Sequence, residues 1–64
     1  MLKPNDYVRD TSQRTGYPTI YRILKIEGDR ALVGRVGELI SGRMAYATRR
    51  DESYRALDNL RVER

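Results

Sequence analysis

The chain has 64 residues, which fits one domain near the lower size limit for folding, because a chain this short buries only about 60% of its unfolded surface. It has no cysteine and no histidine, which excludes disulfides and the usual zinc ligands. Self-association or an efficient core is left as the source of stability. The formal net charge is +4, and 11 of the 13 basic residues are Arg, whose planar guanidinium pairs well with phosphate. The charge favours nucleic acid as a partner, although nine acidic residues are interspersed and solubility alone also explains such a balance.

Targeting and membrane signals are missing from the sequence. No apolar run approaches the roughly 20 residues needed to cross a bilayer, and the first residues lack the apolar segment of a secretory signal. We therefore expect a cytoplasmic protein without a membrane partner.

The first half of the chain predicts strands. Residues 5–10 form an alternating run with Val8 inward, and the polar segment 11–19 reads as a loop. Residues 20–27 are rich in β-branched side chains, and Gly28-Asp29 fits a type II′ turn into a third strand.

A regular hairpin about this turn places Arg22 opposite Arg35. Its reverse side is too apolar for a solvent face, so either the strands bend and bury different faces, as in a closed barrel, or another chain covers it. The residues of this predicted apolar face are Tyr21, Ile23, Leu32 and Val36.

The second half is less regular. Residues 37–43 read as a loop or widened hairpin, and residues 44–49 as a fourth strand with Tyr46 in the core. The tail allows a helix capped by Asp51 or Ser53. The alternative, which we prefer, is a 3₁₀ turn over 57–59 followed by a last strand with Leu60 and Val62 buried, because that strand would pair with the first and cover an open edge.

Three stretches resemble the SH3-like small barrels, a superfold that includes KOW and Tudor-type domains. Residues 3–9 are similar to their opening, with Asn5 where a Gly usually precedes Asp; residues 20–36 are similar to their central hairpin, and residues 57–62 to their closing turn and strand. The resemblance implies one five-stranded all-β barrel over residues 1–64, of a kind that binds nucleic acid or protein segments more often than it catalyses.

Signatures of catalysis are missing. Without His or Cys there is no common catalytic triad, thiolate nucleophile or imidazole base. Asp51-Glu52 lies beside Arg49-Arg50 and reads as a surface ion cluster rather than an acid/base pair. We predict a non-enzymatic protein without a cofactor or metal.

The predicted opposition of Arg22 and Arg35 is the most informative feature. Like charges opposite each other on neighbouring strands are destabilising by up to ~1 kcal/mol, which suggests an anion or an acidic neighbour between them, and the functional interpretation is a phosphate-contact site. Two alternatives stay open: Glu38 or Asp10 neutralises the pair, or a bulge shifts the register.

The sequence therefore supports two hypotheses. In the first, an accessory or regulatory protein contacts nucleic-acid backbone, and Tyr17 in the long loop stacks on a base or anchors its own loop. In the second, the protein is an interaction module or self-associating subunit that uses the apolar face. The residues assigned to nucleic-acid contact are Arg14, Tyr17, Arg22, Arg35 and Arg43.

Overall fold

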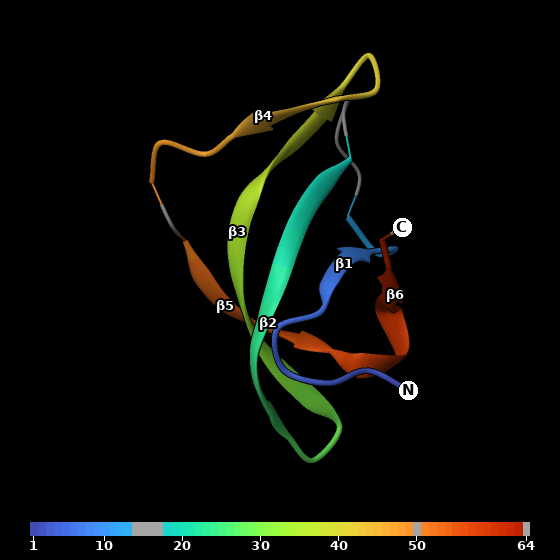
Figure 1. The fold of residues 1–64 in the computed structure, drawn as a ribbon. Coiled ribbons are helices and arrows are strands. Elements are labelled where there is room, and N and C mark those ends of the chain that lie inside the picture. Colours follow the sequence, from blue (N-terminus) through green and yellow to red (C-terminus); the bar gives the residue numbers. More distant parts are fainter. Residues whose placement is uncertain (14–17, 50, 64) are drawn as a thin grey trace.

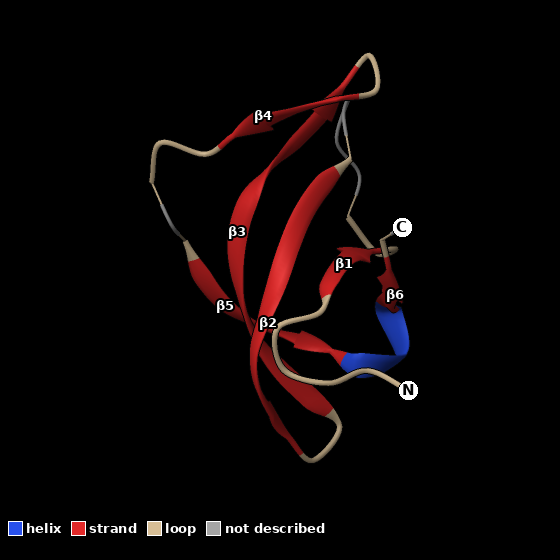
Figure 2. Cartoon of the chain, in the orientation of Figure 1, coloured by secondary structure: helices blue, strands red, loops and turns tan. Residues whose placement is uncertain are grey.

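The structure is a computed structural model that describes residues 1–13, 18–49 and 51–63. Its secondary structure is almost entirely strand, with one short 3₁₀ turn near the end of the chain (Figures 1 and 2). The elements are β1 (Tyr7–Asp10), β2 (Thr19–Glu27), β3 (Arg30–Ile40), β4 (Arg43–Tyr46), β5 (Glu52–Ala56), the 3₁₀ turn η1 (Leu57–Asn59) and β6 (Leu60–Val62).

The strands form one antiparallel sheet around the long β2–β3 hairpin (Figure 1). Its hydrogen-bonded order is β4-β3-β2-β1-β6, and β5 pairs with β3 as well. Strand β3 pairs with both β4 and β5 along the same edge: its first half, residues 30–34, pairs with β5, and its last part, residues 37–40, pairs with β4. The all-β prediction is confirmed, but the prediction of a closed five-stranded barrel is wrong, because the sheet formed by the described residues has six strands and is open.

Strand β5 is the element that the sequence pattern does not predict. Its inward positions are the half-buried Ser53 and Arg55, and none of its five residues is fully buried. An edge strand with polar residues at the inward positions has no apolar alternation to detect. The helix capped by Asp51 or Ser53 is excluded, since residues 52–56 are extended.

The β2–β3 hairpin is regular at both ends and shifted in the middle. Gly28 has a φ of 60°, as the first central residue of a type II′ turn requires, and Glu27 pairs with Arg30 as predicted. Leu24 on β2 and Val36 on β3 are extra residues at two bulges, so that three pairs between them slip by one position.

The slip changes which side chains face the core. Tyr21 and Ile23 are 4% and 0% exposed and pack with Val8, Val33 and others on the inner side of the sheet. Leu32 and Val36 are half-buried elsewhere. The predicted apolar face is therefore wrong as a single surface: bulges divide its members between the core and the outside.

The C-terminal prediction is largely confirmed. The 3₁₀ turn covers residues 57–59, and β6 pairs with β1. Leu60 is buried as expected, but Val62 is exposed. Tyr46 is also exposed rather than part of the core, because β4 is an edge strand that projects with the end of β3 (Figure 1). Within the described residues, no helix is long and apolar enough to span a bilayer.

Candidate functional site

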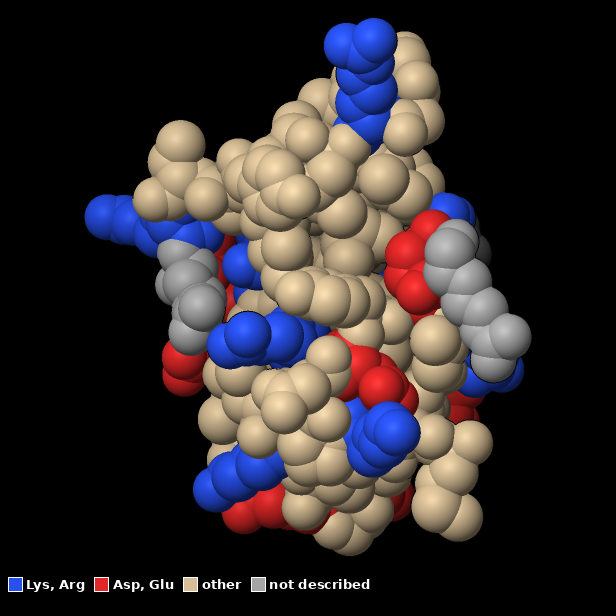
Figure 3. Space-filling view, viewed as in Figure 1, with Lys and Arg blue, Asp and Glu red and all other residues tan. Residues whose placement is uncertain are grey.

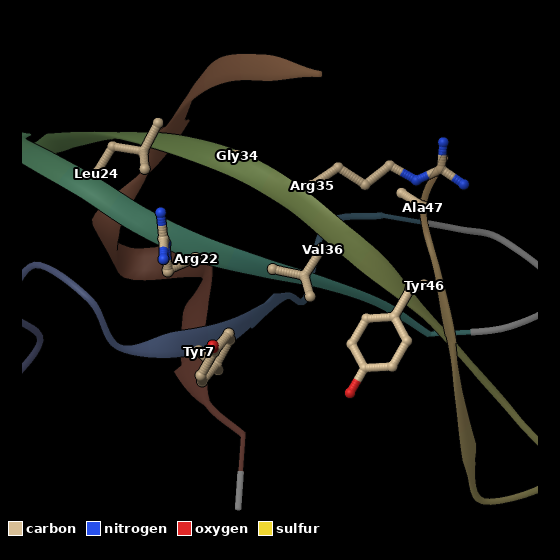
Figure 4. Close-up of a pocket in the computed structure, with 8 residues that line it drawn as sticks. All are labelled: Tyr7, Arg22, Leu24, Gly34, Arg35, Val36, Tyr46 and Ala47. Carbon is tan, nitrogen blue, oxygen red and sulfur yellow. The ribbon is translucent and has the colours of Figure 1, made fainter. Parts of the chain in front are cut away.

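A depression on the outer side of the sheet brings together side chains from β1, β2, β3 and the end of β4 (Figure 4). We call it the outer groove. It encloses about 260 Å³. Its lining residues are Tyr7, Arg22, Leu24, Gly34, Arg35, Val36, Tyr46 and Ala47.

The floor of the outer groove is a row of cross-strand neighbours. Tyr7 pairs with Arg22, and Arg22 pairs with Gly34, so the three residues lie side by side across strands spaced about 4.8 Å apart. Because Gly34 has no side chain, β3 contributes nothing that fills the space beside Arg22 at this position. The hollow is thus a direct result of the slipped register.

The wall of the groove is formed by the end of β4. Tyr46 pairs with Gly37, and the backbone N–H of Ala47 donates a hydrogen bond of 2.7 Å to the carbonyl oxygen of the bulged Val36. A Cβ atom on Gly37 would lie 2.3 Å from the carbonyl oxygen of Ala45. The close approach that brings the Tyr46 ring to the groove therefore requires glycine at position 37.

The two arginines of the groove have different roles. The guanidinium of Arg35 donates a 3.0 Å hydrogen bond to Glu38 and lies 3.7 Å from the carboxylate of Asp51, and its side chain extends away from Arg22 (Figure 4). In the described part of the chain, no carboxylate forms an ion pair with Arg22. None of the described lining residues is acidic, so Arg22 is the groove's available cation.

The predicted opposition of Arg22 and Arg35 is wrong. Arg22 lies opposite Gly34, and Arg35 lies opposite Tyr21. Of the two alternatives, the bulge that shifts the register is confirmed, and Glu38 does neutralise Arg35. Asp10 instead pairs with Arg55.

A second depression lies between β2 and β5 and is polar. Arg55 is fixed there: one terminal nitrogen donates to Asp10 Oδ2 at 3.3 Å, the other donates to the Tyr21 hydroxyl at 3.2 Å, and the guanidinium lies 5.0 Å from the Tyr21 ring centre. Arg35 lines this pocket too, with Glu38 and Asp51 beside it. Each described cation there already has a carboxylate partner, so the pocket stabilises the fold rather than offering charge to a ligand.

Two further ion clusters lie away from the outer groove. A hydrogen bond with Tyr54 and one with Lys25 hold the pKa of Glu27 below its ordinary value, and the same interactions raise the pKa values of Tyr54 and Lys25. Near the C-terminus, a hydrogen bond with Glu63 raises the pKa of Arg9. All three side chains of the first cluster are solvent-exposed, and no further acid joins them among the described residues to make a metal site.

The structure brings together only part of the predicted nucleic-acid site. Arg22 and Arg35 line the outer groove, whereas Arg43 is exposed at the start of β4 and does not line it. Arg14 and Tyr17 lie outside the described residues.

Tyr7 and Tyr46 line the outer groove but were not among the predicted site residues. Tyr7 directly precedes the buried Val8 on β1, and strand alternation therefore placed its ring outward. The alternation of side chains along the strand could therefore have identified Tyr7. No such pattern identifies Tyr46, whose position depends on the short edge strand β4.

Comparisons with known proteins add no family: no protein-family model, curated protein or solved structure matches this chain.

Proposed function

We propose that the protein is a small non-enzymatic nucleic-acid-binding accessory protein that holds a phosphate backbone at the outer groove. The observation that carries the proposal is the charge of this groove, whose described lining includes Arg22 without an ion-pair partner and no acid. A half-buried guanidinium without an ion-pair partner favours an anion. The net charge of +4 supports the same partner class.

The SH3-like resemblance is part of this proposal. In favour of it, β1 pairs with both β2 and the last strand, β3 pairs with β5, and a 3₁₀ turn precedes the last strand. Asn5 adopts a φ of 76°, a left-handed conformation that glycine adopts most easily, which accounts for Asn in the place of the usual Gly. We propose an open variant of that architecture, extended by β4.

The test is the salt dependence of binding to a labelled oligonucleotide, followed by fluorescence anisotropy. Arg22→Gln should weaken binding and reduce the slope of log K against log salt by about 0.7 to 0.9, the value for one lost phosphate contact. Arg30→Gln is the matched control, because it removes the same charge from the exposed start of β3, outside the groove. Equal losses in both variants would mean that binding depends on net charge alone, and unchanged binding of Arg22→Gln would refute the proposed site.

The alternative function is a self-associating subunit. Its surface can no longer include Tyr21 and Ile23, which are in the core, but the exposed Ile40 and Val62 are available. Sedimentation at low and high salt distinguishes the two functions, since an apolar dimer would persist at high salt while nucleic-acid binding would weaken.

A further inference from the structure

The outer groove combines two exposed aromatic rings with the available cation. Tyr7 and Tyr46 are 49% and 76% exposed, and they come from β1 and β4, which do not pair with each other. In the close-up, Val36 lies between the two rings (Figure 4). The space-filling view shows uncharged side chains over the middle of the molecule, with both basic and acidic side chains around them (Figure 3).

This pattern fits unpaired bases better than a duplex. In a double helix the faces of the bases are stacked on one another. A tyrosine ring that lies in the major or minor groove of the duplex therefore does not contact those faces. Duplex-binding surfaces neutralise many phosphates with a continuous basic stripe, whereas this groove offers one arginine free of ion pairs among the described residues. Stacking on aromatic rings tolerates any base sequence because every base has a π face.

We infer that the outer groove binds single-stranded nucleic acid, with unpaired bases stacked on Tyr7 and Tyr46 and a backbone phosphate at Arg22. This inference rests on the proposed function and names its substrate class. The affinity then comes mainly from the rings, and the salt dependence is shallow, near the slope of about 0.7 expected for one phosphate contact on a single strand.

The experiment compares four fluorescein-labelled probes by anisotropy: a ten-nucleotide oligo(dT), the matching oligo(U), a ten-unit abasic strand, and a DNA duplex. The two base-bearing strands should bind more tightly than the duplex and the abasic strand. The ratio of the dissociation constants of oligo(dT) and oligo(U) reports the preference for deoxyribose or ribose. The abasic strand keeps every phosphate and lacks every base, so it separates stacking from phosphate contact.

The variants test the rings directly. Tyr46→Leu and Tyr7→Leu should each weaken oligo(dT) binding about 5- to 150-fold, which corresponds to ~1 to 3 kcal/mol per stacked base, while Tyr46→Phe and Tyr7→Phe should retain it. Tyr54→Leu is the control, because Tyr54 has the same 49% exposure as Tyr7 but lies on β5 outside the groove. Both groove rings are exposed, so these variants are expected to fold, and circular dichroism checks this.

The outcomes separate the inference from the proposed function. If the abasic strand or the duplex binds as tightly as oligo(dT), the protein contacts phosphate without stacking, and the inference fails while the proposed function stands. If no probe binds, both fail. If Tyr54→Leu weakens binding as much as Tyr7→Leu, the site is not the outer groove.

Discussion

The ion pair between Asp10 and Arg55 is the polar interaction whose loss should destabilise the fold most. Asp10 lies on β1 opposite Leu60 of β6, and its side chain is 2% exposed. Its Oδ1 atom accepts hydrogen bonds from the Ser12 N–H at 2.8 Å and the Ser12 hydroxyl at 2.6 Å. Its Oδ2 atom accepts the bond from Arg55, so both oxygens have donors.

Asp10→Asn preserves the size of the side chain and replaces one acceptor oxygen with a donor. The new NH₂ group must face either the two Ser12 donors or the Arg55 guanidinium, so at least one bond is lost and one buried donor is left unpaired. A hydrogen bond to a charged group is worth ~1.5 to 3 kcal/mol. Because the Arg55 side chain is 30% exposed, water recovers part of the loss, and we expect a destabilisation of ~2 kcal/mol within that range.

That loss is large for a chain of this size. At roughly 0.05 to 0.15 kcal/mol per residue, the whole domain has a free energy of unfolding of about 3 to 10 kcal/mol. Each kcal/mol shifts the melting temperature of a domain this small by about 4 to 8 °C, so Asp10→Asn should lower it by roughly 8 to 16 °C.

Urea unfolding followed by circular dichroism measures the effect, and a double-mutant cycle with Arg55→Met isolates the pair. We expect a coupling energy above about 1 kcal/mol. The control is Lys25→Gln, which removes the exposed pair with Glu27 and should change the unfolding midpoint much less. A coupling energy near zero, with Asp10→Asn no worse than the control, would refute the structural role of the pair.

Three further predictions concern single residues. Gly37→Ala places a methyl carbon 2.3 Å from the Ala45 carbonyl oxygen, so the amides of residues 43–46 should lose protection from hydrogen exchange by NMR while those of β2 keep it. Asn5→Ala should destabilise the fold by ~1 kcal/mol in urea because its φ is 76° and alanine avoids that region, whereas Asn5→Gly should not. Because Tyr54 lowers the pKa of Glu27 from 4.5, the stability that Glu27 adds is complete above that pH and is lost as the pH falls through the lowered pKa. The midpoints of wild type and Glu27→Gln should therefore converge in acid, and a gap that persists there would contradict the assignment.

The sequence predicted those strands that carry an apolar residue at a buried position. Val8 on β1 and Leu60 on β6 each mark an inward position correctly, and the turn at Gly28 follows from local backbone chemistry alone. Strand β5 was missed because its inward residues, Ser53 and Arg55, are polar. The burial of Arg55 depends on a partner, Asp10, that is distant in the sequence and that periodicity cannot identify.

The outer groove was predicted less well than the fold because bulges leave no apolar pattern. The pairs Glu27–Arg30 at the turn and Ile20–Gly37 at the far end both agree with a regular hairpin. The extra residue on β2 and the extra residue on β3 offset each other. The pairs at both ends of the hairpin therefore keep the regular register and give no sign of the shift in the middle. Only the intervening pairs change, and they include Arg22 with Gly34.

This local shift also shapes the outer groove. In the regular register Arg22 would face a second arginine, and the two side chains would repel each other and occupy the space between the strands. In the shifted register, Arg35 is drawn to Glu38 and Asp51 on the other side, while Gly34 leaves room next to Arg22. The carbonyl oxygen of the bulged Val36 accepts a hydrogen bond from the Ala47 N–H, and this contact anchors the end of β4 with the Tyr46 ring beside the groove. Two inserted residues thus separate the charges, open the hollow and fix its aromatic wall, so the groove depends on the bulges and not on any motif of the sequence.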